Sequence, residues 1–244
     1  MLNEILLAVI QAATEFLPIS SSGHLALISN LISKPNLFFF TALHLASLIA
    51  VIIFTRKEIF NLITFNKKYK KLWIYLIIAT IPAALFGFFF NSLIEKTFTS
   101  YLLLSITFLF TAIILFLTRF TKTNSKLNLK NTLFIGLFQV LALFPGVSRS
   151  GMTISASLFS GIKKEKATKF SFLLFIPLAI GAFMLELKDF YISTSLIISF
   201  IICIIFSLLF LNLLTIIIKK QKFWLFGFYC LLMSAISFTL YILN

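Results

Sequence analysis

Near its N-terminus the chain reads Glu15-Phe16-Leu17-Pro18-Ile19-Ser20-Ser21-Ser22-Gly23-His24. This stretch places a carboxylate, three hydroxyls and an imidazole in an otherwise apolar segment. Polar groups at membrane depth are costly and persist mainly where they pair, line a cavity or take part in chemistry. A second stretch, Pro145-Gly146-Val147-Ser148-Arg149-Ser150-Gly151, is similar and adds a cation. We therefore interpret the two stretches as partners in one site.

The composition is that of a membrane protein. Hydrophobic residues make up 60% of the 244 residues, mean hydropathy is +1.08, and only 11% of residues are charged. Soluble domains are about a quarter charged. Apolar runs of membrane-crossing length recur at 38–54, 72–90, 101–118, 170–185, 195–218 and 223–243. The sequence predicts an all-α polytopic membrane protein.

The basic residues are distributed as the positive-inside rule requires. Net charge is +14, but 17 of the 21 lysine and arginine residues lie in four short loops, at 55–71, 119–130, 163–169 and 219–222. This pattern argues against a nucleic-acid partner. It predicts that all four loops face the cytoplasm.

Two apolar stretches are interrupted in the middle. Residues 131–161 lie between two cytoplasmic loops, so they must begin and end on the cytoplasmic side. Since Pro145 and Gly146 break this stretch, we expect a re-entrant hairpin surrounded by protein or by a watery cavity. Residues 1–30 have the same form, with a break at Pro18. They are expected to begin and end on the opposite side.

The two interrupted stretches also match in sequence. At an offset of 128 residues, identical residues align at Gln11 and Gln139, Phe16 and Phe144, Ser20 and Ser148, Ser22 and Ser150, and Gly23 and Gly151. We therefore expect one membrane domain, 1–244, built from repeats 1–120 and 131–244, each a re-entrant hairpin plus three spans. Because three is odd, the repeats would have inverted topology, with the site near the midplane. The alternative is chance identity in Ser- and Gly-rich turns.

The two breaks together offer phosphate-binding chemistry. Helix starts after Pro18 and after Gly146 would present backbone N–H groups to an anion. Arg149 can bind phosphate oxygens bidentately and stabilise charge on a transferring phosphoryl group. Ser21 and His24 are three residues apart and would share a helix face.

Each of these groups also has a structural interpretation. Ser, Gly and Pro clusters often only permit kinks or close packing in membrane helices. Glu15 and Arg149 could simply neutralise each other. The other histidine, His44, lies in an apolar span near Thr41 and Ser47. We interpret it as a structural hydrogen-bonding residue.

The sequence resembles the bacterial undecaprenyl-diphosphate phosphatases, also called bacitracin-resistance proteins. The stretches Gln11–His24 and Pro145–Gly151 are similar to the two signature motifs of that family. Similarity extends to Leu43–Val51 followed by Arg56 and Lys57, to Ala79–Ala83 and to Phe170–Pro177. The resemblance covers most of the chain in the same order.

The resemblance implies an enzyme of the bacterial inner membrane. It would hydrolyse undecaprenyl diphosphate, a polyprenyl diphosphate lipid, to undecaprenyl phosphate and phosphate. That reaction recycles the lipid carrier for peptidoglycan synthesis and gives bacitracin resistance. The resemblance further implies an active site open to the periplasmic side, a divalent cation (Mg or Ca) as cofactor, and a homodimer. The main alternative is a transporter or flippase of prenyl phosphate lipids.

The resemblance also assigns roles to individual residues. Ser21 would be the nucleophile, and His24 the acid/base or, as a weaker alternative, the nucleophile. Glu15 would orient or deprotonate, or hold a metal, and Arg149 would bind the diphosphate. The expected substrate-binding residues are Gln11, Ser20, Ser22, Gln139, Ser148, Ser150 and Gly151.

One position departs from the pattern of the family. Well-described members carry a second Glu four residues before the motif Glu, where this chain has Gln11. Gln cannot act as a base and is a weaker metal ligand, which argues against a two-carboxylate metal site. A metal could instead arrive on the substrate diphosphate.

Overall fold

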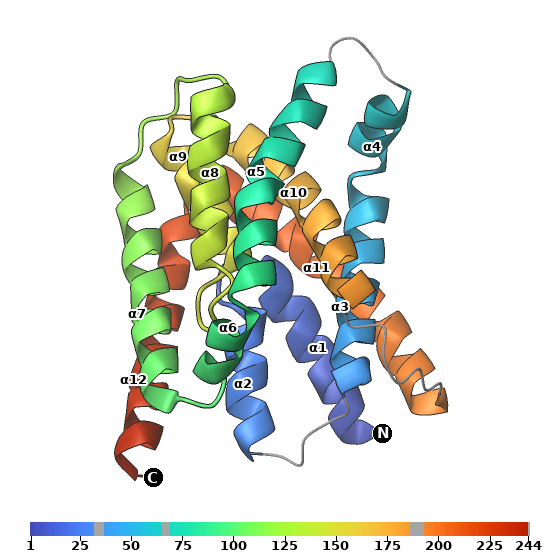
Figure 1. The fold of residues 1–244 in the computed structure, drawn as a ribbon, viewed down its shortest axis with the longest axis vertical. Coiled ribbons are helices and arrows are strands. Elements are labelled where there is room, and N and C mark those ends of the chain that lie inside the picture. Colours follow the sequence, from blue (N-terminus) through green and yellow to red (C-terminus); the bar gives the residue numbers. More distant parts are fainter. Residues whose placement is uncertain (32–36, 65–68, 186–192, 244) are drawn as a thin grey trace.

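The computed structural model describes residues 1–31, 37–64, 69–185 and 193–243, which form helices joined by short connections (Figure 1). In chain order the elements are α1 (Leu2–Phe16), α2 (Ser21–Leu31), α3 (Leu37–Phe54), α4 (Arg56–Ile63), α5 (Lys70–Phe89), α6 (Asn91–Thr97), α7 (Tyr101–Leu117), η1 (Thr118–Phe120), α8 (Leu129–Leu141), α9 (Arg149–Phe159), α10 (Lys164–Leu185), α11 (Thr194–Lys219), η2 (Phe223–Leu225) and α12 (Phe226–Leu243).

Helices of membrane-crossing length occupy the predicted apolar runs. Within the described residues, α5, α10 and α11, α7 together with η1, and α12 together with η2 are each long and apolar enough to cross a bilayer. The helices α3 and α4 together give a sixth candidate, although they bend by 78°. The bend follows Phe54, where the apolar run gives way to the charged start of α4 at Arg56. Charged side chains there favour the membrane interface over the hydrocarbon core.

Two of the predicted loops contain helix. The segment 55–71 includes α4 at Arg56–Ile63, and α10 begins at Lys164, inside the predicted loop 163–169. The first turns of α10 are Lys164-Glu165-Lys166-Ala167, and these residue types have high helix propensity. The helix therefore continues beyond the apolar run.

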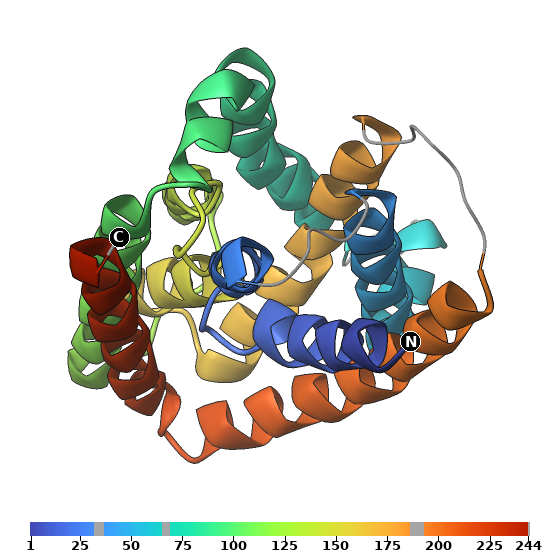
Figure 2. The ribbon, with the colours of Figure 1, turned by 90° about the horizontal axis from the view of Figure 1, so that it is seen from below.

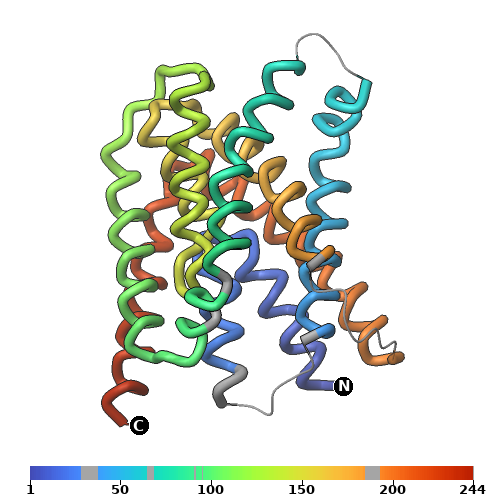
Figure 3. Tube along the Cα trace, viewed as in Figure 1, coloured from blue at the N-terminus to red at the C-terminus, as the bar shows by residue number. Residues whose placement is uncertain are grey.

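Two helical hairpins enter the molecule from opposite ends (Figure 1). The first consists of α1 and α2 with a break at 17–20, and the second of α8 and α9 with a break at 142–148. Both breaks contain a proline, and each contains a residue with a left-handed backbone: Ser20 at φ 68° and Gly146 at φ 91°. The tube in Figure 3 follows both hairpins to turns that lie at mid-height.

The longer helices surround these hairpins. The helix α1 packs against α11, α8 against α5, and α7 against α12. Seen from below, α11 runs along the outer side of α1, while α7 and α12 form a pair at one edge (Figure 2). Side chains on the outer helix faces are exposed and apolar, as at Phe88, Phe89 and Leu209. Such a surface suits contact with lipid.

The predicted basic segments gather at one end of the molecule. The described parts of 55–71, the α7–α8 connection, the α9–α10 connection and the α11–α12 turn all lie at the upper end in Figure 1. Both chain termini lie at the lower end. Lys34, Lys67, Lys68 and Lys188 fall outside the described residues.

Candidate active site

The two helix breaks touch each other at the centre of the molecule. The Gly146 backbone N–H donates to Ser20 Oγ over 3.1 Å, and Ser150 Oγ donates to the Leu17 carbonyl over 3.3 Å. A Cβ atom at Gly23 would lie 2.8 Å from Gly146 Cα. Only glycine permits this approach, so the two motifs meet because both carry glycine at the contact.

Threonines of α7 support the second break. The hydroxyls of Thr107 and Thr111 lie 2.7 and 2.9 Å from the carbonyl oxygens of Pro145 and Gly146. A break in a membrane helix leaves carbonyls without their helical partners, and leaving them unpaired in an apolar interior would be costly. The two threonines therefore satisfy the backbone where it leaves α8.

Both returning helices begin with a serine cap. Ser148 Oγ accepts from the Gly151 N–H over 3.1 Å at the start of α9, and Ser20 Oγ accepts from the Gly23 N–H over 3.2 Å at the start of α2. Capping of this kind contributes about 1 kcal/mol per helix. It also places two helix N-termini together, and these favour negative charge.

Glu15 connects the two motifs through both of its carboxylate oxygens. Arg149 Nη2 donates to Oε1 over 2.7 Å, Ser21 Oγ donates to Oε2 over 2.7 Å, and Gln11 Nε2 donates to Oε2 over 3.0 Å. The side chains of Glu15 and Arg149 are only 7% and 11% exposed. The Arg149 guanidinium also lies 4.0 Å above the centre of the Phe175 ring. This cation–π contact helps to hold the guanidinium at the site.

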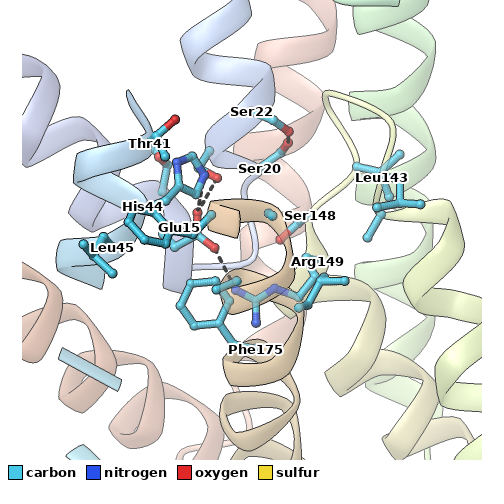
Figure 4. Close-up of a pocket in the computed structure, with 18 residues that line it drawn as sticks. Glu15, Ser20, Ser22, Thr41, His44, Leu45, Leu143, Ser148, Arg149 and Phe175 are labelled. Atoms are coloured by element: carbon cyan, nitrogen blue, oxygen red, sulfur yellow. Dashed lines mark hydrogen bonds and ion pairs between the residues drawn. The ribbon is translucent and has the colours of Figure 1, made fainter. Parts of the chain in front are cut away.

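These groups line a cavity of about 220 Å³ (Figure 4). Six of the predicted site residues lie on its wall: Glu15, Ser20, Ser21, Ser22, Ser148 and Arg149. Apolar side chains from the second break and from α10 complete the wall, among them Leu143, Leu178 and Phe183. The cavity thus combines a charged, hydroxyl-rich wall with an apolar one, which suits a ligand with a phosphate head and a hydrocarbon tail.

Four other predicted residues support the wall from behind. Gln11 bonds to Glu15, and Ser150 and Gly151 lie where the breaks touch. Gln139 is buried and donates to the Ala79 carbonyl over 3.3 Å. For these residues the structure supports a positioning role rather than contact with a ligand in the cavity.

His24 is not brought to the cavity, contrary to the expectation that it works beside Ser21. Its Nδ1 lies 2.7 Å from the Ser20 carbonyl and its Nε2 lies 2.7 Å from the Tyr229 hydroxyl. The ring stacks on Tyr229 and meets the edge of Phe108. Although Ser21 and His24 are one turn apart, the bond to Ser20 and the stacking turn the imidazole toward α7 and α12.

Among the cavity residues that were not predicted as site residues, His44 and Phe175 lie against the Glu15–Arg149 pair. His44 does make the expected structural hydrogen bond, since its Nδ1 lies 3.0 Å from the Phe40 carbonyl. It also lines the cavity, with Nε2 3.6 Å from Glu15 Oε2. An ionisable residue inside an apolar span was the available signal for His44. Phe175 lies in the family-like segment Phe170–Pro177, but no chemical feature of the sequence separates it from the other 31 phenylalanines.

The cavity residues do not by themselves form a metal site. Glu15 is the one acidic side chain among the described residues that line the cavity. Both of its oxygens face donors, and one of these donors is a guanidinium. The described part of the chain contains no group of three His, Cys, Asp or Glu side chains that could hold a metal ion. In the described part of the chain, Glu15 is therefore not joined by two further His, Cys, Asp or Glu side chains that would complete a metal site.

Comparison with known proteins gives consistent matches over nearly the whole chain. The family model described as bacitracin resistance protein BacA matches residues 4–236. An undecaprenyl-diphosphatase of Thermosipho africanus is 43% identical, covering 97% of this chain and 99% of the relative. One from Methanococcus maripaludis is 40% identical, covering 98% and 99%. One from Thermotoga petrophila is 37% identical, covering 96% and 98%.

Proposed function

This chain belongs to the bacitracin resistance protein family, and on that basis we propose that it hydrolyses undecaprenyl diphosphate to undecaprenyl phosphate and inorganic phosphate. The activity would recycle the lipid carrier used in cell-wall synthesis. One structural observation supports assigning this activity to the cavity. Ser21, Glu15 and Arg149 are linked by hydrogen bonds of 2.7 Å on the wall of one cavity.

Ser21 is the proposed nucleophile. Its Oγ attacks the terminal phosphorus while its proton passes to Glu15 Oε2, the atom to which it already donates. The bond from that phosphorus to the bridging oxygen breaks, and the departing undecaprenyl phosphate takes the proton from Glu15. Water then attacks the phosphoserine and gives a proton to Glu15, which returns it to Ser21 Oγ as inorganic phosphate leaves. A positioned base of this kind contributes roughly 10²–10⁴-fold.

Arg149 is the proposed phosphate clamp. The bond to Glu15 uses one of the five guanidinium N–H donors. A guanidinium suits bidentate binding of phosphate oxygens and stabilises the charge that develops during phosphoryl transfer. Ser148, Ser20 and Ser22 lie on the same wall, next to the two helix starts. Together they supply hydroxyl donors around the anion.

A divalent cation is proposed to enter with the substrate. A diphosphate binds Mg²⁺ or Ca²⁺ through its own oxygens. Glu15 is the one carboxylate among the described cavity-lining residues, and Gln11 stands in place of a second one; both facts favour this route over a resident metal site. Removing the cation with a chelator should then raise KM for the diphosphate rather than unfold the protein.

The enzyme is proposed to lie in the bacterial inner membrane with its basic end in the cytoplasm. The positive-inside rule supports this orientation. On α10, which starts near the basic end and descends to about mid-height in Figure 1, the cavity-lining residues all lie in the second half, from Phe175 to Phe183. This position supports an opening toward the periplasmic side.

We also propose that residues 1–120 and 131–244 are inverted repeats. The matched residues of the two motifs support this, as does the approach of the two hairpins from opposite ends (Figure 1). The packing supports it as well. The pairing of α1 with α11 corresponds to that of α8 with α5, and α7 pairs with its own counterpart α12.

Phosphate release from purified protein tests the proposed activity. In detergent, the wild type should release phosphate from C15 and C55 prenyl diphosphates. Ser21→Ala and Arg149→Ala should abolish that release while the protein stays monodisperse. Robust phosphate release by both variants would overturn the mechanism.

The same assay distinguishes hydrolysis from the transporter alternative. Broken helices that meet at mid-membrane also occur in transporters. Binding of the prenyl diphosphate by the wild type without any release of phosphate would favour transport over hydrolysis.

A further inference from the structure

His44 presents an imidazole nitrogen to the cavity beside the proposed nucleophile. Its side chain is 41% exposed and lies on α3, across from the two helix breaks (Figure 4). Nε2 lies 3.6 Å from Glu15 Oε2, the same oxygen that accepts from Ser21. The imidazole therefore lies beside the carboxylate oxygen that would take the proton from Ser21 in the proposed mechanism.

Hydrogen bonding determines which nitrogen is available. Nδ1 lies 3.0 Å from the Phe40 carbonyl, and a carbonyl oxygen can only accept. Nδ1 of His44 therefore carries a proton and donates it to the Phe40 carbonyl within α3. In the described part of the chain, Nε2 forms no hydrogen bond, since Glu15 lies just beyond that distance. Nε2 is thus the atom that a ligand in the cavity can reach.

His24 offers no comparable atom. Its Nδ1 is used by the Ser20 carbonyl, and its Nε2 is used by the Tyr229 hydroxyl. It is buried and lies off the cavity wall. A ligand could reach His24 only after the contact with Tyr229 is broken.

We propose that His44 is a catalytic residue that contacts the terminal phosphate of the substrate opposite Arg149. This inference rests on the proposed hydrolysis. Glu15, His44 and Arg149 are the ionisable side chains among the described cavity-lining residues. A phosphate between His44 and Arg149 lies next to Ser21 and is held from two sides. A single proton is shared between His44 Nε2 and a phosphate oxygen. It comes either from the imidazole or from the phosphate.

Two isosteric variants separate contact with substrate from a structural role. In His44→Asn, the amide N–H replaces Nδ1 and keeps the bond to Phe40, but nothing replaces Nε2. In His44→Gln, the amide N–H lies near the position of Nε2, while the bond to Phe40 is lost. If Nε2 contacts phosphate, kcat/KM for C15 prenyl diphosphate should fall about tenfold or more in the Asn variant and recover in the Gln variant.

A matched control on the same helix is Ser47→Ala. Ser47 is buried one turn after His44, bonds to Cys203 over 3.7 Å and does not line the cavity. Its removal changes the polar content of α3 without touching the site. The variant should keep the wild-type kcat/KM. The melting temperature of each variant in detergent checks that the fold is retained.

A binding measurement makes the inference independent of turnover. Methylenediphosphonate, which cannot be hydrolysed, is titrated into the wild type and both His44 variants. The Asn variant should bind it about tenfold more weakly than the Gln variant. If the wild type binds this probe but releases no phosphate from prenyl diphosphate, the proposed hydrolysis fails and the His44 contact stands. The inference is overturned if the Asn variant equals or exceeds the Gln variant in both measurements.

Discussion

Glu15 and Arg149 show how much one buried pair depends on both members. Neither side chain is more than 11% exposed, and they are 2.7 Å apart. Taking two charges out of water is costly, and their attraction repays this only while both are present. At the scale of single residues, the pair therefore serves stability as well as chemistry, as the neutralisation interpretation anticipated.

Removal of one member should destabilise the protein more than removal of both charges. Arg149→Ala leaves the Glu15 carboxylate buried without its cation, with an expected loss of about 3 kcal/mol. Adding Glu15→Gln to that variant should restore part of the loss. Melting temperatures in detergent measure this cycle. Additive losses would show that the pair contributes no coupling.

Tyr229 provides a second residue-scale prediction. Its hydroxyl is 2.7 Å from His24 Nε2, and the Ser20 carbonyl requires the His24 proton to be on Nδ1. Tyr229→Phe therefore leaves a buried acceptor unpaired and should cost about 1 kcal/mol of stability. Phosphate release should stay close to wild type. A collapse of kcat at unchanged melting temperature would instead show that His24 takes part in the reaction.

At the scale of elements, the breaks are formed by local chemistry and positioned by tertiary contact. Pro18, Pro145 and Gly146 end helices because of their own backbone preferences. The sequence therefore predicts where α1 and α8 end. It does not determine that Ser20 Oγ meets the Gly146 N–H, because that bond joins residues 126 apart and depends on α7 holding the second break.

Gly23 tests the contact between the two breaks. In Gly23→Ala, the new methyl carbon would lie 2.8 Å from Gly146 Cα and 2.6 Å from the Phe108 ring. Because moving the Gly146 backbone away would cost free energy, we expect Gly23→Ala to lower the melting temperature and to abolish phosphate release.

Gly181→Ala is the matched control for that substitution. A Cβ at Gly181 on α10 meets nothing within 4 Å. Replacing a mid-helix glycine by alanine should stabilise α10 by about 0.5–1 kcal/mol. If Gly23→Ala behaved like this control, the close approach of the breaks would not matter for stability.

At the scale of the whole molecule, the basic segments predict orientation. Single cysteines at Lys126 and Lys220 should react with a membrane-impermeant maleimide only from the cytoplasmic side. A cysteine at Thr99, an exposed residue before α7, should react from the outside. The two native cysteines are buried and should remain unlabelled. Labelling of Lys126 from the outside would contradict the proposed orientation.

The sequence by itself determined the long apolar helices, the breaks and the residue types of the site. Continuous apolar runs, prolines and loop charges act locally, so they can be interpreted along the chain. Only the tertiary structure decided which polar groups face one another. It brought Glu15, Ser21 and Arg149 to one cavity, turned His24 toward Tyr229 and placed His44 beside Glu15. The physical reason is that the direction of a side chain inside a membrane protein depends on the hydrogen-bond partners that neighbouring helices supply. Those partners come from distant parts of the chain.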